Sequence, residues 1–508
     1  MSESRTLKSR RNIAAGLMQY AVNLLLVWAG RIIFVMVLSK EYLGINGLFT
    51  NVISILSVAD LGIPTAMTYA LYKPLAEGDT KKISSMVTFF RKIFLVIGCA
   101  VFAAGLLLIP VLPLIVKLDR EIPHLTAYYV LILLNTVVTY FFYYRTTLFT
   151  ADQKSYVLQN YIIIFRLIAV ALQSVVLFLF KNYFIYLATS TLVAVISNIV
   201  QNMAAFKYYP YLKEPSEPLP SDERKSIRDN VRDLFIYRIC GVVQSNTDSI
   251  LISLFAGTVV VGYYSNYQMM IFAVTSVITV IFTNVKASLG NLIASKDTTA
   301  EKRLEVFGTI ENMNFWLTAF CSISFLCLFQ SFIDISFGAE YEVPLFTVVL
   351  IVLNFYTSNS LQSIWAFRET IGMFREIRFI IAVTAVINLV LSIIMGFFWG
   401  MPGVLIATII ARMIYSWWRE PMILFNKYFC CSARRYYLQY VVKVVVFALV
   451  ALVSYLLCEL IRLPNIYVSF ALKVLFCAVV PNAVFFLILR RDKGVRDLLK
   501  RLVSFGKK

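Results

Sequence analysis

Eight charged side chains lie inside long apolar stretches of this sequence and are its first candidates for chemistry: Arg31, Asp60, Arg166, Arg238, Asp248, Glu311, Arg412 and Lys473. A charge at the centre of a lipid bilayer costs roughly 2.5–3.5 kcal/mol on insertion scales, so each of these residues needs a partner or a use. Five of the eight are basic, which leaves a surplus of positive charge. Because guanidinium groups bind phosphate oxygens in pairs, this surplus favours a phosphate-bearing anion as the ligand.

The predicted substrate-binding residues are four arginines: Arg31, Arg166, Arg238 and Arg412. Asp60 and Asp248 are expected to neutralise arginines while the site is empty, or to carry a coupling ion. On an alternative interpretation the arginines are only structural partners of these two carboxylates, and removing one partner would then destabilise the fold. Glu311 and Lys473 fall near the ends of their stretches, where long charged side chains can extend to the membrane surface.

Several catalytic and metal-binding patterns are absent from the sequence. His124 is the only histidine, which excludes a His-based zinc site and a Ser-His-Asp triad. None of the eight cysteines has metal-ligand spacing with a histidine. No G-x-x-x-x-G-K-[ST] motif for ATP binding occurs. We therefore predict neither an enzyme nor a metal or organic cofactor.

Polar side chains recur at helical spacing in four of the apolar stretches. The four sets are Asn46, Thr50, Ser54, Ser57, Asp60, Pro64 and Thr68; Asn135, Thr139, Tyr143 and Thr146; Arg238, Gly241, Ser245 and Asp248; and Asn354, Ser358, Gln362 and Trp365. At 100° per residue, each set falls on one side of a helix. Such a side faces either a water-filled cavity or a neighbouring helix, because polar groups that face lipid are costly. The sets that carry a charge favour the cavity, so we expect Asn46, Ser57 and Ser245 to line it together with Asp60 and Asp248.

Membrane-spanning helices are the elements that must position these residues. Of the 508 residues, 60% are hydrophobic and 15% are charged, and the mean hydropathy is +0.77. A soluble protein would carry roughly a quarter charged residues. The apolar stretches are long enough to cross the hydrocarbon layer and lack the alternating pattern of a β-barrel. The sequence therefore predicts an all-α polytopic membrane protein.

About fourteen spans are expected. Their approximate limits are 12–38, 45–72, 88–116, 122–150, 157–180, 182–206, 231–256, 258–288, 304–330, 343–368, 376–398, 402–427, 440–460 and 466–490. With the N-terminus inside, only five basic loop residues fall on the outer side: Lys40, Lys117, Arg120, Lys181 and Arg462. Because cytoplasmic loops are rich in Lys and Arg, both termini are predicted to be cytoplasmic. The net charge of +19 is then a topology signal, and no nucleic-acid partner is predicted.

A polar, proline-containing gap at 207–229 separates six spans from the other eight. Two pairs of similar short segments relate the two sides of this gap. Leu43-Gly44-Ile45-Asn46 opens the second span and Val261-Gly262-Tyr263-Tyr264 opens the eighth, 218 positions later. Arg145-Thr146-Thr147-Leu148 closes the fourth span and Arg368-Glu369-Thr370-Ile371 closes the tenth, 223 positions later. These similar segments predict two six-helix bundles of the same orientation, 1–206 and 230–427, with 207–229 as a cytoplasmic linker and two further helices and a basic tail in 428–508.

Three segments carry a family resemblance: Leu43-Gly44-Ile45-Asn46-Gly47-Leu48-Phe49, Ala59-Asp60-Leu61-Gly62-Ile63 and Tyr72-Lys73-Pro74-Leu75. With the number of spans, they resemble the bacterial polysaccharide transporter family. These are Wzx-type flippases of the MOP superfamily, related to lipid II flippases and MATE exporters. The resemblance implies a V-shaped, two-bundle transporter that alternates between inward-open and outward-open states. It also implies an essential arginine in the first helix and an acidic residue late in the second, and Arg31 and Asp60 match these places.

On this resemblance, the protein translocates undecaprenyl-pyrophosphate-linked oligosaccharide units across the bacterial cytoplasmic membrane for capsule, O-antigen or exopolysaccharide assembly. Its partners would be the anionic lipid-linked oligosaccharide, membrane lipids, and a polysaccharide polymerase and glycosyltransferases. An inside-negative potential favours the outward movement of an anion by about 2.3 kcal/mol per charge per 100 mV. The sequence leaves open whether a proton or a sodium ion is also coupled to transport.

Two other functions share parts of this pattern. A MATE-type drug or cation exporter has the same architecture, but a cationic cargo favours an acidic lumen, whereas arginine outnumbers aspartate in these spans. A membrane-embedded polymerase or glycosyltransferase would need a sizeable outer domain with catalytic residues, and the outer connections here are short. We therefore expect a lipid-linked oligosaccharide flippase, with the MATE-type exporter as the first alternative.

Overall fold

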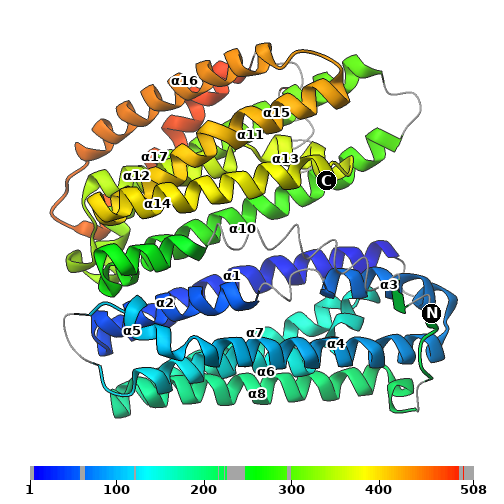
Figure 1. Cartoon of the computed structure of the whole chain (residues 1–508). Coiled ribbons are helices and arrows are strands. Elements are labelled where there is room, and N and C mark those ends of the chain that lie inside the picture. The colour runs from blue at the N-terminus through cyan, green and yellow to red at the C-terminus, as the bar shows by residue number, and fades with distance from the viewer. Residues whose placement is uncertain are drawn as a thin grey trace. The chain divides into compact units, whose positions relative to one another are not determined.

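Two compact helical units make up the chain, Met1–Gly262 and Tyr263–Lys508 (Figure 1). The computed structural model describes residues 5–57, 63–118, 122–214, 217–221, 224–225, 246–294, 299–490 and 496. The gap at 207–229 lies within the first unit, and its role as a linker between bundles stays a prediction.

The first unit is built around the long helix α6. Its helices are α1 (Arg5–Val37), α2 (Lys40–Leu56), α3 (Ile63–Glu77), α4 (Thr80–Leu107), α5 (Leu112–Ile115), α6 (Leu125–Ala151), α7 (Ser155–Phe180) and α8 (Tyr183–Tyr208), and residues 246–256 are also helical. Helix α6 packs against α2, α3, α4 and α8, while α1 packs along α7. The side chains of Asp79 and Asn182 cap the N-termini of α4 and α8, where backbone N–H groups have no partner within the helix.

The second unit is built around α11. Its helices are α10 (Thr258–Ala294), whose first turn belongs to the first unit, α11 (Ala300–Phe337), α12 (Leu345–Asn359), α13 (Gln362–Thr370), α14 (Phe374–Ala411), α15 (Trp417–Leu424), α16 (Arg434–Glu459) and α17 (Ile466–Leu489). Helix α11 packs against α12, α13, α16 and α17. Thr299 and Asn465 cap the N-termini of α11 and α17 with their side chains.

Helix α14 consists of two helices that reverse direction at Gly400. This residue has φ 59°, in the left-handed region that glycine adopts without a Cβ penalty. Across the turn, the Asn388 side chain donates to the Thr408 hydroxyl at 2.9 Å, and the Thr384 and Ser416 hydroxyls lie 2.8 Å apart. Thr384 and Ser416 are equally far from Gly400 in sequence, and the midpoint of Asn388 and Thr408 lies two residues before it, as in an antiparallel hairpin. The chain therefore crosses here twice, as the two predicted spans require.

The second arm of this hairpin continues through two π-helical turns, Arg412–Ser416 and Phe425–Phe429, on either side of α15. A π-helical turn holds one residue more than an α-helical turn. Each of these turns therefore rotates the side chains that follow it by about 100° relative to a regular helix. Such turns occur frequently at functional sites.

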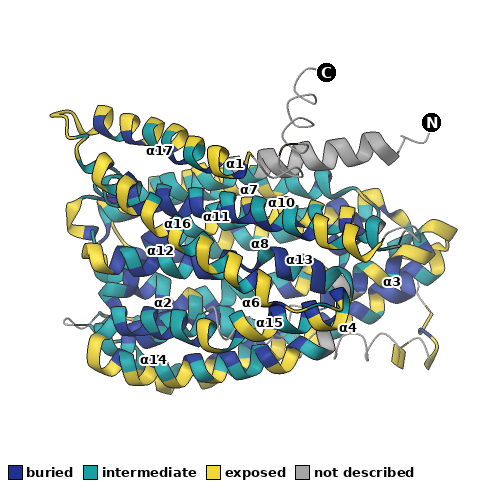
Figure 2. Cartoon of the chain, turned by 90° about the horizontal axis from the view of Figure 1, so that it is seen from above, coloured by how far each residue is buried: buried dark blue, intermediate teal, exposed yellow. Residues whose placement is uncertain are grey.

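Ten helical segments among the described residues are long and apolar enough to cross a membrane. Exposed positions, yellow in Figure 2, recur along these helices. Many of them are large apolar residues; Leu107, for example, is 77% exposed. Soluble proteins rarely expose contiguous apolar surface on this scale, whereas lipid tails would cover it. The predicted all-α, multi-pass membrane fold is confirmed.

Candidate functional site

Arg412 lies in the first π-helical turn, close to the polar set of the tenth predicted span. Its guanidinium donates to the backbone and side-chain oxygens of Asn354 at 3.2 and 3.3 Å, and to the Thr357 hydroxyl at 3.5 Å. The Asn354 amide in turn donates to the Leu405 carbonyl at 3.0 Å. Arg412 is half-buried. These bonds to neutral oxygens of α12 hold the guanidinium beside the polar set of the tenth span.

Arg31 and Arg166 lie in the first unit, on the neighbouring helices α1 and α7. Arg31 is half-buried and Arg166 is exposed. The charges of both residues act on the hydroxyl of Tyr186, which α8 supplies. Because α1 packs along α7, two of the four predicted arginines come from neighbouring helices although they are 135 residues apart in sequence.

The polar set of the second span bonds largely to its own helix. Thr50 donates to the Asn46 side-chain oxygen at 3.3 Å, and Ser54 and Ser57 donate to carbonyls one turn earlier, at 2.8 and 2.9 Å. Asp248 is half-buried in the helical stretch 246–256. Three predicted site residues lie outside the described residues: Asp60, Arg238 and Ser245. The role of this set as a cavity lining stays a prediction.

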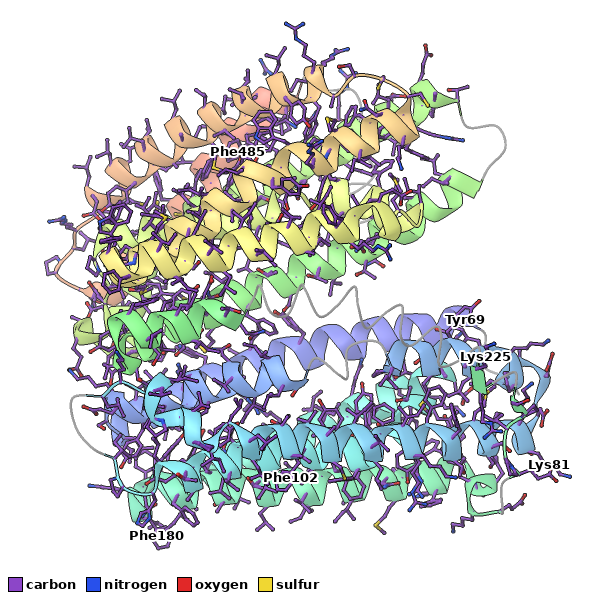
Figure 3. All side chains as sticks on the ribbon, viewed as in Figure 1. Tyr69, Lys81, Phe102, Phe180, Lys225 and Phe485 are labelled. Atoms are coloured by element: carbon purple, nitrogen blue, oxygen red, sulfur yellow. The ribbon has the colours of Figure 1, made fainter. Side chains whose placement is uncertain are left out.

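Two of the predicted polar sets meet in one pocket of the first unit. The pocket has a volume of about 380 Å³ between α3, α6 and the start of α7. It takes Pro64 and Thr68 from the second span and Tyr143 and Thr146 from the fourth. The remaining lining residues, of which Tyr69 is labelled in Figure 3, are Tyr69, Tyr72, Thr147, Thr150 and Leu158. Threonine and tyrosine side chains from two helices therefore line this space together with apolar surface.

A cysteine at Thr68 should react with a water-soluble thiol reagent about tenfold faster than a cysteine at Leu107, because the reactive thiolate forms in water. Leu107 is the control, since it is an exposed apolar residue on the lipid-covered surface of α4. The measurement is the rate of maleimide labelling in membranes of a protein in which the exposed Cys99 and Cys430 and the half-buried Cys431 are replaced by serine. Equal rates at the two positions would show that the pocket is closed to water.

A buried ion pair in the second unit was not predicted from the sequence. The Arg368 guanidinium lies 2.5 Å from the Glu420 carboxylate, which also accepts from the Trp365 indole at 3.0 Å. Both charged residues are buried, with 6% and 3% exposure. The pair joins α13 to α15, which connects the end of the tenth span to the second half of the twelfth. Glu420 could have been noticed in the sequence, because it is an acidic residue in an apolar stretch. Its position beside Arg419 and Pro421, however, resembles a loop.

The first unit contains a counterpart of this pair. Arg145 closes α6 and donates to the Asn202 side chain of α8 at 2.5 Å, with the Phe206 ring 4.1 Å from its guanidinium carbon. Arg368 follows Arg145 by 223 positions, and Glu420 follows Asn202 by 218. These offsets match those of the two pairs of similar segments. These two contacts therefore stand at the offsets that the predicted repeat requires, with a neutral partner for Arg145 and an ionised partner for Arg368.

A group of polar side chains next to the Arg145–Asn202 contact connects the ends of α6 and α8. The Tyr209 hydroxyl, just after α8, donates to Asp152 at 3.0 Å, and Lys154 lies 2.6 Å from the same carboxylate. Burial and the neighbouring carboxylate hold the pKa of Tyr209 well above its usual range. Burial also raises the pKa of Tyr211 to about 12. Both hydroxyls stay protonated, so Tyr209 ties the end of α6 to the end of α8 at any physiological pH.

A groove of about 830 Å³ runs along the second unit between α11, α16 and α17. Its lining is mostly apolar, but Glu311 and Lys443 form an ion pair at 3.3 Å within it, and Ser363 donates to the same carboxylate. The expectation that Glu311 extends to the membrane surface is wrong, because the residue is 6% exposed. The same correction applies to Lys473, which is 8% exposed and donates to Ser331 at 3.4 Å. In both cases neighbouring helices supply polar partners, which removes the need to reach water.

Three solved structures that share this fold are a lipid II flippase and two MATE transporters. The lipid II flippase MurJ in an inward closed conformation matches with a TM-score of 0.69 and 14% identity, over 94% of this chain and 98% of that one. An inward-facing multidrug resistance MATE transporter of the MOP superfamily matches with a TM-score of 0.55 and 15% identity, over 80% and 94%. A point mutant of the Vibrio cholerae MATE transporter VcmN matches with a TM-score of 0.57 and 11% identity, over 84% and 99%. The fold is therefore of the MurJ and MATE type.

The sequence itself identifies the family within this class. Residues 9–286 match the family described as polysaccharide biosynthesis protein. This match covers more than half of the chain, so the protein belongs to that family. None of the curated protein sequences matches the chain. The resemblance to the polysaccharide transporter family is confirmed.

Proposed function

We propose that the protein is a flippase that moves undecaprenyl-pyrophosphate-linked oligosaccharide units across the bacterial cytoplasmic membrane by alternating access. The observation that carries this proposal is the set of arginines in apolar helices: Arg166 and Arg412 lie in segments long enough to cross a membrane, and Arg31 lies in the shorter apolar segment Val22–Val37. A cationic guanidinium suits a diphosphate far better than the cationic cargo of a drug exporter. Membership of the polysaccharide biosynthesis family supports the same cargo class.

The groove of the second unit adds support for an amphiphilic cargo. It combines apolar side chains such as Phe315 and Val446 with the Glu311–Lys443 ion pair. A lipid-linked sugar has the same two parts, an apolar chain and a polar head. A groove lined in this way can therefore hold the junction of the two, with the apolar chain against the exposed side of α16.

The proposal includes the topology and the energy source. Both termini and the segment 207–229 are placed in the cytoplasm, as the distribution of basic residues favours. The protein acts as a carrier and catalyses no covalent chemistry, so its cargo is supplied by glycosyltransferases and consumed by a polymerase. The membrane potential drives the anion outward, and a proton or a sodium ion bound at Asp60 or Asp248 is the alternative or additional driving force.

Replacing Arg412 with alanine should lower polysaccharide export about tenfold while protein abundance stays normal, because one charge-assisted contact to the anion is lost. Lysine at this position keeps the charge but loses the bidentate geometry, so Arg412→Lys should show an intermediate rate. The measurement is export by a deletion strain that expresses each variant, normalised to membrane protein level.

Arg419→Ala is the matched control, since Arg419 is exposed on the following helix and should be replaceable without effect. In the same strains, lipid-linked oligosaccharide should accumulate on the inner leaflet when Arg412 is alanine. Normal export by Arg412→Ala at normal abundance would remove Arg412 from the anion site. Drug sensitivity of the deletion strain with unchanged polysaccharide would instead favour the exporter.

A further inference from the structure

Three cysteine thiols from three different helices meet inside the second unit. Cys327 comes from α11, Cys458 from the end of α16 and Cys477 from α17. Their sulfur atoms all lie within 4.8 Å of one another, and the Cys458 and Cys477 sulfurs are 4.0 Å apart. All three side chains are buried in the apolar core that also contains Phe485 (Figure 3).

These distances match the spacing of sulfur ligands around a metal ion. A zinc–sulfur bond of about 2.3 Å places the sulfurs of a tetrahedral site roughly 3.8 Å apart and those of a trigonal site roughly 4.0 Å apart. The observed 4.0 Å pair already meets this requirement. The third thiol needs to move by less than about 1 Å, the size of a small χ1 adjustment. Soft thiolate ligands select thiophilic metal ions over calcium or magnesium.

A buried ammonium group lies beside the thiols. Lys473 precedes Cys477 by one turn of α17, is 8% exposed, and its charge acts on both Cys458 and Cys477. Its hydrogen bond to Ser331 is long, 3.4 Å. Among the residues that the structure describes, no carboxylate forms an ion pair with Lys473. A buried charge without a counter-charge is costly, so this position calls for a negative partner.

Charge balance identifies the kind of ion that suits the cluster. Three thiolates and a divalent cation carry a net charge of −1, and the Lys473 ammonium brings the total to zero. Neutrality matters because the surroundings are apolar. Three thiolates around a monovalent cation would leave an uncompensated negative charge. A divalent ion with filled d orbitals also accepts three sulfurs and one water without geometric strain.

We propose that Cys327, Cys458 and Cys477 form a binding site for a thiophilic divalent cation of the Zn²⁺ and Cd²⁺ class, with Lys473 as its counter-charge. Binding converts three thiols to thiolates and releases three protons to water. The ion can reach the site from the loop that follows α16, because Cys458 is the penultimate residue of that helix and Leu460 is 80% exposed. The bound ion joins α11, α16 and α17, so it stabilises the second unit independently of transport.

The competing explanation is that the cysteines act as small apolar side chains in a packed core. A cadmium titration of the purified, reduced full-length protein distinguishes the two. We expect one Cd²⁺ per chain, an ultraviolet thiolate-to-cadmium absorption band, and the release of three protons per ion. At a cadmium concentration about a hundredfold above Kd, the melting temperature should rise by about 5 °C.

Single serine variants of the three cysteines should lose the stoichiometric band, whereas Cys321→Ser should keep it. Cys321 is the matched control because it is also a buried cysteine of α11 but lies outside the cluster. Lys473→Met should weaken binding about tenfold or more without changing the band per bound ion, since it removes charge and no ligand.

Three results would overturn the proposal. The first is a titration that is the same in Cys327→Ser as in the unchanged protein. The second is the absence of the band in the unchanged protein, which would leave the cysteines as core packing. The third is a pair of thiols that becomes accessible to alkylation under denaturing conditions only after reduction, which would make the cluster a disulfide.

Discussion

Replacing Glu420 with alanine should remove most of the folded protein from the membrane. The carboxylate is buried against the Arg368 guanidinium at 2.5 Å, so its loss removes a counter-charge from a buried cation. Breaking a buried ion pair in this way costs about 3–5 kcal/mol, more than a hundredfold in the folding equilibrium. The measurement is the amount and the melting temperature of detergent-extracted protein by size-exclusion chromatography.

Two controls separate burial from charge in this experiment. The double variant Arg368→Met with Glu420→Leu should recover much of the lost stability, because neither charge then remains buried alone. Lys302→Ala breaks the exposed pair of Lys302 and Glu305 and should change the stability by less than about 1 kcal/mol. The interpretation fails if Glu420→Ala melts at the same temperature as Lys302→Ala.

Alanine at Gly44 should disrupt the packing of α2 against the first turn of α10. A Cβ atom at this position would lie 2.1 Å from the Thr258 carbonyl oxygen. Thr258 cannot easily move, because its N–H donates to the Lys117 carbonyl at 2.8 Å and its hydroxyl accepts from the Lys117 N–H at 2.9 Å. We expect a loss of about 1–3 kcal/mol of stability and of most export activity. Thermal melting and polysaccharide export measure the two effects.

Gly308→Ala is the matched control for this substitution. Gly308 is also a helical glycine, but a Cβ there has no neighbour within 4 Å. Alanine favours a helix by up to about 1 kcal/mol over glycine, so Gly308→Ala should be neutral or stabilising. If the two alanine variants melt alike, α2 and α10 do not approach each other as closely as described.

Most of the helices could be predicted from the sequence. A long apolar stretch in a membrane protein must form a helix, because every backbone polar group has to be satisfied within the segment. The reversal at Gly400, for example, follows from two apolar stretches that are too long together for one span. The sequence similarity around Gly44 and Gly262 could also be detected, and the structure explains it. A Cβ at Gly262 would lie 2.8 Å from the Gly44 nitrogen, so each glycine is required by the other.

The candidate site was less predictable, because its contacts join residues that are distant in sequence. The spacing within one helix shows which face is polar, but it does not show whether Asn354 faces water or accepts from Arg412. The thiol cluster joins positions 327, 458 and 477 and therefore has no sequence motif. Glu420 was missed for a similar reason, since its partner Arg368 lies 52 positions away.

The two π-helical turns have a consequence for comparing this chain with its relatives. Relatives that lack the extra residue will align with a one-residue gap in the middle of the helix that carries Arg412 and Glu420. Such a gap corresponds to a change of helix rotation, whereas gaps usually correspond to loops. Alignments that move the gap to the nearest loop will therefore pair Glu420 with residues on the wrong face of that helix, and its counterpart will appear unconserved even where the ion pair is kept.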